Sequence, residues 1–292
     1  MSLEKAHFTG SAGEQLFYRL WQPAMEARAL IVIVHGAAEH SGRYQRFAEN
    51  FTALGYAVAS LDLPGHGESA GRRGHIRRFA EYLDAVDTFA GLLDGRFETT
   101  PQVLLGHSMG GLIAARYLLD GPDAFAACAL SAPAIATDLT PPDWQLGIIR
   151  GLSVLWPTLG VLQLDAAGIS RDLSEVQIYL DDPKIYRGKL SARLVWELFA
   201  TMAEVQKRAE ELTLPLLCLH GDADVLTAHS GSVLLHERAC SKDKTLKLYP
   251  GLYHEIFNEP ERASVFADLA AWLNTRLDRR STEGNHARRQ GD

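Results

Sequence analysis

Three residue types that together perform acyl transfer, a serine, a histidine and an aspartate, occur in this chain in an order that fits one catalytic site. Ser108 is the centre of Gly-His-Ser-Met-Gly at 106–110, between an apolar run at 102–105 and a helical pattern at 110–119. A serine on a tight strand-to-helix turn is held in strained backbone geometry with its hydroxyl exposed. A β-carbon on either flanking glycine would collide with a neighbouring element. This context, more than the string itself, predicts that Ser108 is a nucleophile.

Ser108 needs a base, because an unaided hydroxyl is a poor nucleophile at neutral pH. With this kind of elbow the chain order is Ser, then Asp or Glu, then His. His254 follows the last predicted strand closely, so its loop should reach the same sheet edge as the elbow. Asp222 and Asp224 both follow the apolar run 214–220. We prefer Asp224, which lies deeper in the loop, while Asp222 is the alternative and could bond the loop backbone.

Other histidines at strand ends fit structural roles better than the role of base. His220 precedes both candidate acids, and His107 should point away from the hydroxyl and brace the sheet. A tetrahedral intermediate also needs two backbone N–H donors. Met109 follows the nucleophile, and Ala37 lies in the loop after an earlier strand, so these two are the candidate oxyanion donors. His35 is predicted to hold that loop in place.

Composition favours an enzyme that is neither secreted nor embedded in a membrane. The chain has 292 residues, 47% of them hydrophobic, which is enough for one large core or two smaller ones. Its net charge of −7 argues against a nucleic-acid partner. The start lacks a secretory signal, and no run of ~20 apolar residues occurs. Cys128 and Cys218 lie in apolar runs, as expected of buried thiols in a reducing compartment. We therefore expect a cytoplasmic protein.

The core of the sequence alternates strands and helices, which predicts an α/β fold with an open, mostly parallel sheet. Ligands of such a sheet bind at the carboxyl ends of its strands. Strands are predicted at 15–21, 29–35, 56–61, 102–105, 126–131, 214–220 and 245–249, and helices at 44–53, 79–93, 110–119, 230–239 and 262–276.

The alternation fails between the fifth and sixth predicted strands, over a segment too long for a plain loop. We predict an α/β core at 1–133 and 212–278, a helical cap at 134–211 and a disordered tail at 279–292. Helical patches in the cap are expected at 174–180 and 191–208. The cap's first half is rich in apolar residues, including Trp144 and Trp156. These residues line a channel or touch a lipid surface, or they pack the cap onto the core.

Sequence strings typical of other functions are incomplete here. The run Gly-His-Gly-Glu-Ser-Ala at 65–70 resembles a dinucleotide fingerprint, but Gly-Arg-Arg-Gly follows it in place of a helix. His254-Glu255 begins like a zinc motif, yet Asn258 stands where the second histidine would be. We therefore expect no cofactor and no metal. The sequence carries no signal of oligomeric state.

The chain resembles the monoacylglycerol lipases of the serine α/β-hydrolase superfamily, most closely the bacterial forms. The resemblance covers nearly the whole chain, cap included, and ends before the tail. Its most specific string is His-Gly-x-x-Glu-His-Ser-Gly-Arg-Tyr. The strings that carry it lie at 35–44, 62–69, 106–111, 130–133, 220–224 and 249–255.

The resemblance implies hydrolysis of the single fatty acyl ester of a monoacylglycerol, without a cofactor. It places the nucleophile, acid and base on Ser108, Asp224 and His254, and the oxyanion donors on Ala37 and Met109. Glu39 and Arg43 fall where the family shapes a polar region near the glycerol. One departure is Phe257, where the mammalian form has a histidine. This departure implies that a hydrogen-bond network there is lost or rebuilt.

Four other functions stay open from the sequence. A lysophospholipase would use cationic groups for the phosphate, and a basic cluster occurs at Arg72, Arg73, Arg77 and Arg78, although a solvated face explains it better. A broad carboxylesterase would need only the catalytic groups. A peptidase would need acidic groups facing the substrate amine, and the cap shows no cluster of them. A non-catalytic binder of small apolar molecules would have no need of the three candidate groups.

Overall fold

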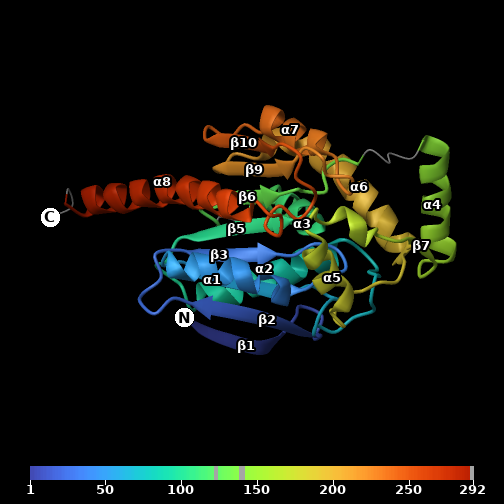
Figure 1. Cartoon of the computed structure of the whole chain (residues 1–292), viewed down its shortest axis with the longest axis horizontal. Helices are drawn as coiled ribbons and strands as arrows, with labels where there is room; N and C mark the ends of the chain where they lie inside the picture. Colours follow the sequence, from blue (N-terminus) through green and yellow to red (C-terminus); the bar gives the residue numbers. More distant parts are fainter. Residues whose placement is uncertain (122–123, 138–141, 290–292) are drawn as a thin grey trace.

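The computed structural model describes residues 1–121, 124–137 and 142–289. In this part of the chain eight strands form one sheet in the order β1-β2-β4-β3-β5-β6-β9-β10 (Figure 1). Their bounds are β1 Ser2–Thr9, β2 Gln15–Gln22, β3 Leu30–Val34, β4 Ala57–Asp62, β5 Gln102–His107, β6 Ala127–Ser131, β9 Leu216–Gly221 and β10 Lys244–Tyr249.

The sheet is parallel from β4 through β10, and β1 and β2 add an antiparallel edge. The predicted α/β fold with a mostly parallel sheet is therefore confirmed. The β1 strand was not predicted, because its side chains alternate between exposed and half-buried. An edge strand packs against the core on one face at most, so its sequence shows no continuous apolar run.

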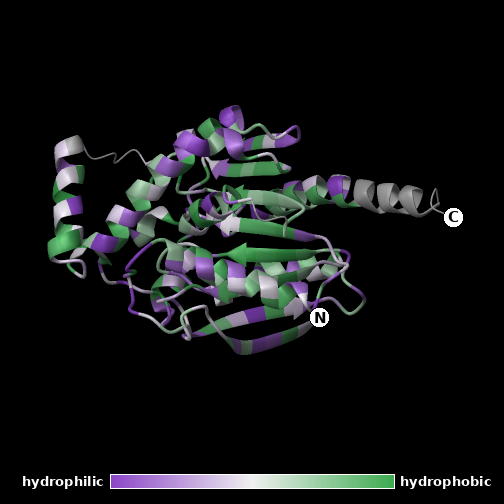
Figure 2. Cartoon of the chain, turned by 180° about the vertical axis from the view of Figure 1, so that it is seen from behind, coloured by the Kyte–Doolittle hydropathy of each residue, from purple (hydrophilic) through white to green (hydrophobic). Residues whose placement is uncertain are grey.

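Helices cover both faces of the sheet, which explains why its central strands are almost wholly apolar (Figure 2). In β3, Leu30, Val32 and Val34 face one core and Ile31 and Ile33 the other, as the two-residue period of a strand requires. The first core contains side chains of three helices that cover the sheet and of a fourth, at Ala192–Arg208, from the segment between β6 and β9, and the second core contains those of two others. The helices are α2 Ala80–Asp94, α3 Met109–Leu118 and α7 His229–Arg238 on the first face, with α1 Gln45–Ala53 and α8 Arg262–Arg289 on the second.

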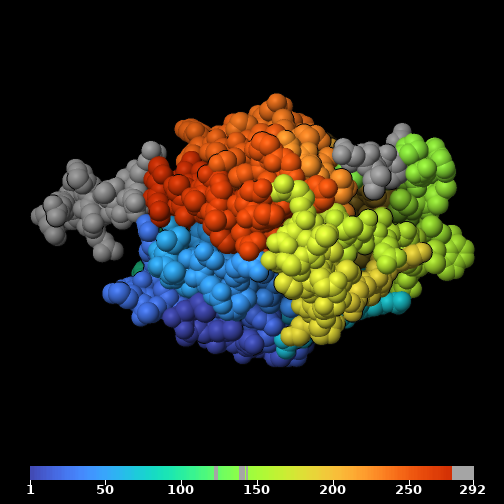
Figure 3. Space-filling view, in the orientation of Figure 1, coloured from blue at the N-terminus to red at the C-terminus, as the bar shows by residue number. Residues whose placement is uncertain are grey.

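The segment between β6 and β9, which we call the cap segment, lies at the carboxyl ends of the parallel strands (Figures 1 and 3). It is largely helical, and its two short strands, β7 and β8, pair with each other. Its elements are α4 Asp143–Leu155, β7 Gly160–Leu162, a 3-10 turn at Ala166–Gly168, α5 Leu173–Asp181, β8 Leu190–Ser191, α6 Ala192–Arg208 and a 3-10 turn at Ala209–Glu211. Residues 138–141, within the predicted cap, lie outside the described part.

The final helix is longer than the predicted helix 262–276. Residues 279–289, which belong to the predicted tail, continue α8, which ends at Arg289 (Figure 1). The sequence there lacks an apolar face. Adding a residue to an existing helix makes one hydrogen bond without a new nucleus, so a helix can outlast its packed face. Residues 290–292 of the predicted tail lie outside the described part.

Candidate active site

Ser108 lies at the end of β5, where the chain turns sharply into α3. Its φ of 54° and ψ of −121° are strained for a residue with a β-carbon. The turn is tight, because a β-carbon on Gly106 would overlap the Gly110 carbonyl, and one on Gly110 would overlap the carbonyl of Val34. The Ser108 amide donates to the Ser131 carbonyl at 3.0 Å, which ties the turn to β6. The elbow predicted from the sequence is thus present, and Ser108 is part-exposed at its tip.

The loop after β3 lies directly against the elbow. A β-carbon on Gly36 would stand only 3.1 Å from that of Ser108. His35 Nε2 accepts the Leu63 amide at 2.9 Å, so its Nδ1 carries the proton and donates to the Gly36 carbonyl at 2.8 Å. The peptide bond that follows is trans, so the N–H of Ala37 points away from His35.

Both candidate oxyanion donors border the cavity described below. Met109 is the first residue of α3, where a backbone N–H has no partner within its own helix. Among the hydrogen bonds of the described residues, neither the Ala37 nor the Met109 amide acts as a donor. These two groups are therefore available to an oxygen that carries negative charge.

The loops after β9 and β10 bring the acid and the base together. The two strands are parallel and in register, with Gly221 beside Tyr249, so both end at the same level. Ala223 donates to the Leu252 carbonyl at 3.1 Å, and Asp222 Oδ1 accepts the Gly251 amide at 2.6 Å. Asp222 thus binds the backbone of the loop, which is the structural role that the sequence suggested for it.

Asp224 is the carboxylate that meets the candidate base. Its Oδ2 accepts a bond from His254 Nδ1 at 2.7 Å, and also from Thr227 Oγ1 at 2.9 Å and His220 Nε2 at 3.1 Å. Its Oδ1 accepts the amides of Leu226 at 2.7 Å and Thr227 at 3.0 Å. Five donors on one carboxylate fix its orientation and favour its ionised form.

The charges of the pair support each other. Burial raises the pKa of Asp224, but the neighbouring His254 and the hydrogen bonds from His220, His254 and Thr227 outweigh this and hold the pKa well below its ordinary value. Burial lowers the pKa of His254, yet the charge and hydrogen bond of Asp224 together with Glu255 and Glu39 raise the pKa above its ordinary value overall. His254 can therefore accept a proton and keep it while Asp224 stays ionised.

His107 is a poor alternative base. Its Nδ1 lies 3.1 Å from the Ser131 carbonyl, and its ring centroid lies 4.8 Å from that of His254. Burial and the neighbouring His254 hold the pKa of His107 well below its ordinary value, so the ring stays neutral. It joins β5 to β6, which is a structural role.

Two buried carboxylates share one arginine beside His254. Arg43 Nη2 donates to Glu255 Oε2 at 2.5 Å, and its Nε lies 3.4 Å from Glu39 Oε2. The other oxygen of Glu39 accepts the Gly36 amide at 2.6 Å and the Tyr44 hydroxyl at 2.9 Å. Burial and the charge of Glu255 raise the pKa of Glu39 to about 7.

Only part of this group borders the main cavity. Glu39 and Glu255 line it, whereas Arg43 lies behind them at a small neighbouring cavity. Phe257 borders the small cavity too and packs on Phe47, with ring centroids 5.2 Å apart. The histidine of the mammalian form is thus replaced here by an aromatic contact of Phe257. Arg43 instead has Glu255 as a second carboxylate partner.

Ser108 and His254 open into one cavity of about 610 Å³ under the cap segment. One end is polar and is formed by Glu39, His107, Thr227 and Glu255 together with the two catalytic candidates. The rest is mostly apolar and comes largely from the cap segment, with Thr137, Gln163 and Asp165 as further polar lining residues. The apolar lining includes Ile149, Leu152, Val161, Leu162, Leu164, Ile169, Tyr179, Leu190, Val195, Leu198, Phe199, Met202, Val225 and Leu226.

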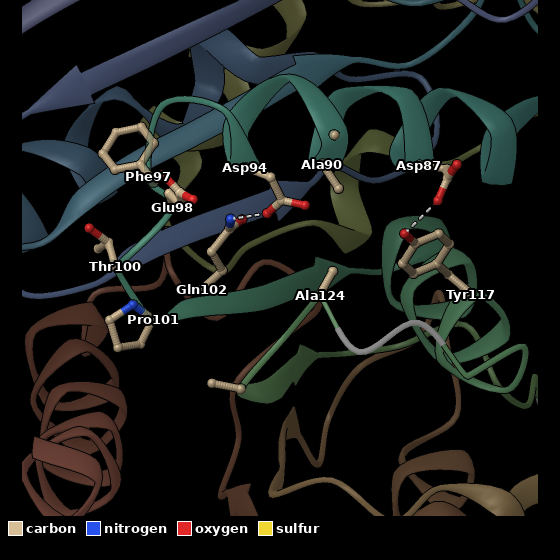
Figure 4. A pocket seen from close by; sticks show the side chains of 12 residues that line it. Asp87, Ala90, Asp94, Phe97, Glu98, Thr100, Pro101, Gln102, Tyr117 and Ala124 are labelled. Atoms are coloured by element: carbon tan, nitrogen blue, oxygen red, sulfur yellow. Dashed lines mark hydrogen bonds between the residues drawn. The ribbon is translucent and has the colours of Figure 1, made fainter. Parts of the chain in front are cut away.

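A second hollow lies at the opposite end of β5, between α2 and α3 (Figure 4). Tyr117 donates to Asp87 at 2.9 Å and Gln102 donates to Asp94 at 2.5 Å across it. Among its described lining residues no serine, cysteine or histidine occurs, so it lacks the pairing of a serine with a histidine found beside Ser108.

No group of three or more His, Cys, Asp or Glu side chains in the described part of the chain is placed to hold a metal ion. Nor does any helix there combine the length and the apolar character that a membrane crossing needs.

Sequence reasoning missed three residues of this site. His220 was set aside as a base, and the structure shows it as a donor to Asp224. Its position at the end of a strand, four residues before Asp224, was a usable signal. Glu255 could have been noticed as an acid next to the base. Thr227 gave no signal, because a loop threonine has no special spacing.

Comparisons with known proteins agree with this geometry. The family model described as serine aminopeptidase, S33, matches residues 25–261. A monoacylglycerol lipase of Mycolicibacterium smegmatis is 40% identical over 92% of this chain and 96% of its own length. The phospholipase YtpA of Bacillus subtilis is 36% identical over 84% and 95%. The crystal structure of a Paleococcus ferrophilus monoacylglycerol lipase has a TM-score of 0.79 at 32% identity and covers 94% of this chain and all of its own. The chain therefore belongs to the serine aminopeptidase, S33, family of α/β-hydrolases, and within it to the monoacylglycerol lipases, which are carboxylic ester hydrolases.

Proposed function

We propose that this chain hydrolyses the fatty acyl ester of monoacylglycerols, giving glycerol and a free fatty acid. The observation that carries the proposal is the cavity beside Ser108, with a long apolar part and a short polar end. A single-chain lipid has the same division. Relatives named for this activity support the same conclusion.

Catalysis runs through an acyl-enzyme on Ser108. His254 takes the hydroxyl proton as Ser108 attacks the ester carbonyl, and Asp224 stabilises the imidazolium that forms. The N–H groups of Ala37 and Met109 stabilise the oxyanion. His254 then protonates the departing glycerol, and a water activated by His254 hydrolyses the acyl-enzyme.

The polar end suits a neutral alcohol. Glu39 and Glu255 offer carboxylate oxygens that accept hydrogen bonds from hydroxyl groups. Arg43 is held between these two carboxylates, which compensate its charge. It therefore acts on the head group by holding Glu39 and Glu255 in place.

The apolar lining suits an acyl chain. Burying each methylene contributes ~0.8 kcal/mol, so kcat/KM should rise about fourfold for each added methylene until the cavity is full. Shortening the chain should reverse the gain.

A lysophospholipase is the second candidate, since one relative is named a phospholipase. No lysine or arginine occurs among the described residues that line the cavity, whereas two glutamates do. Arg77 and Arg78, from the basic cluster seen in the sequence, pair with Glu81 and Asp84. A phosphate would thus meet two carboxyl groups and no cationic side chain in the lining of the polar end, which favours the neutral head group.

The test compares kcat/KM for a monoacylglycerol, the lysophosphatidylcholine of the same acyl chain and a short p-nitrophenyl ester. We expect the monoacylglycerol to be the best substrate, and Ser108→Ala to abolish all three activities and labelling by a fluorophosphonate. A preference for the phospholipid would establish the second candidate. Wild-type protein that neither labels nor turns over would mean a non-catalytic binder.

We also place the protein in the cytoplasm, with peripheral membrane contact through α4. The inner side of α4 lines the cavity through Ile149 and Leu152. Its outer side and the following turn are exposed, Trp144 by 64% and Trp156 by 61%. Aromatic side chains of this kind are favoured at membrane interfaces. The free thiols of Cys128 and Cys218 fit a reducing compartment.

A further inference from the structure

The loop that carries Ala37 has an unfavourable backbone conformation. Ala38 has a φ of 66°, in the left-handed region that non-glycine residues rarely adopt. A strained residue keeps its conformation only where surrounding contacts hold it. Core contacts hold the loop on both sides of Ala38. Before it, His35 and Glu39 bind the Gly36 carbonyl and amide, and after it the Tyr44 hydroxyl donates to Glu39 at 2.9 Å.

The cap segment adds contacts of its own at Ala38 itself and at His40. The Tyr186 amide donates to the Ala38 carbonyl at 2.9 Å. His40 Nε2 lies 2.8 Å from Asp182 Oδ2, although 142 positions separate the two residues. Because His40 Nδ1 accepts the Gly42 amide at 3.1 Å, the proton is on Nε2 and His40 is the donor.

The two cap residues belong to one short, ordered stretch. Asp182 Oδ1 accepts the Lys184 amide at 2.8 Å, so the same carboxylate shapes the turn that leads to Tyr186. His40 is buried and Asp182 partly so. Burial lowers the pKa of His40, although the bond and charge of Asp182 oppose this, so the ring stays neutral and suits a donor role.

We propose that Asp182 is a positioning residue for the reaction: through His40, and through the turn that presents the Tyr186 amide, it holds the oxyanion loop 36–40 in its reactive conformation. The inference rests on the proposed function, because it concerns the donor Ala37 of that mechanism. This part of the cap segment then acts on the chemical step, besides enclosing the substrate. Asp182 acts through the loop and touches neither the ester nor the acyl chain.

The proposal predicts a specific kinetic pattern. Removing one oxyanion donor from a serine hydrolase costs ~10²–10³ in kcat. A misplaced donor should cost less, so we expect Asp182→Ala to lower kcat roughly tenfold to a hundredfold with KM nearly unchanged. A trifluoromethyl ketone, which forms a hemiketal oxyanion on Ser108, should bind more weakly by the same factor. Affinity for a non-reacting product such as a fatty acid should not change.

The experiment measures these constants on wild type, Asp182→Ala, His40→Ala and the double variant. Each value is normalised to the fraction of active sites found by fluorophosphonate titration. If the two residues act as one unit, the double variant should be no worse than the poorer single variant. His40→Gln, whose amide can still donate, should recover part of the loss.

Lys184→Ala is the matched control. Lys184 also joins the cap segment to the core, through its ammonium group and Glu68 at 2.5 Å, but only its backbone contacts Asp182. We expect it to leave kcat and ketone affinity unchanged. An active wild type with unchanged ketone affinity in Asp182→Ala overturns the positioning role. So does a loss of stability alone, with normal constants per active site. An inactive wild type instead overturns the proposed function.

Discussion

His220 Nε2 lies 3.1 Å from the same Asp224 oxygen, Oδ2, that accepts the bond from His254. Its Nε2 also lies 3.3 Å from the Thr227 carbonyl, and because both oxygens only accept, Nε2 carries a proton. His220 is fully buried, and its Nδ1 lies 2.8 Å from the Ser232 hydroxyl. It therefore acts as a donor that orients Asp224, and the candidate site contains two histidines on one carboxylate with different functions.

Removing this donor should weaken catalysis without abolishing it. A hydrogen bond to a charged group contributes ~1.5–3 kcal/mol, so we expect His220→Ala to lower kcat by roughly tenfold or more. His220→Gln, which keeps a donor, should lose less. Steady-state kinetics on an unaggregated preparation of each variant decide this. Equal losses in both variants would mean that the ring packs the loop and does not orient Asp224.

Substitution of the two aspartates in the loop after β9 should have clearly different effects on kcat. Asp224→Asn removes the anion that stabilises the imidazolium and can favour the wrong tautomer of His254, so kcat should fall by about 10⁴. Asp222 is exposed, its side chain accepts the Gly251 amide, and Asp222→Asn keeps an oxygen acceptor for that amide. We expect its kcat to stay close to that of wild type. A reversed order of the two losses would assign the acid to Asp222.

The acid limb of the pH profile should report Glu255. Catalysis needs neutral His254, so kcat/KM rises with pH through the pKa of that ring. The Glu255 carboxylate is one of the groups that raise this pKa. Glu255→Gln should lower the pKa of His254 and move the acid limb to lower pH. Glu261→Gln, in an exposed ion pair with Arg171, is the control and should not move it. An acid limb of Glu255→Gln that stays at the same pH, or that moves to higher pH, would contradict this prediction.

The exposed aromatic residues of the cap segment should control membrane contact. Trp144→Ala with Trp156→Ala should reduce co-sedimentation with liposomes and lower activity on vesicle-bound monoacylglycerol. Hydrolysis of a water-soluble short ester should be unaffected, because neither side chain lines the cavity. Met25→Ala, 85% exposed on the loop before β3, is the matched control. Unchanged sedimentation of the double variant would exclude α4 as the contact.

Local signals in the sequence were sufficient for most of the fold. The apolar run before Ser108 and the helical pattern after it specify β5, the elbow and α3 in consecutive residues. The same is true of the buried strand before Asp224. The edge strand β1 was missed, because half-exposed positions carry little apolar signal. The end of α8 was missed, because helix continuation needs no apolar face.

By itself, the sequence determined the family, the sheet and the candidate nucleophile, acid and base, because each depends on the residue types of a short stretch. Only the tertiary structure decided which partners meet: Arg43 with Glu255, 212 positions apart, and His40 with Asp182. It also gave His220 its role and showed that the apolar cap residues divide between a cavity and an exposed surface. Hydrogen bonds and ion pairs require atoms within about 3–4 Å, and only the packing of distant elements sets such distances.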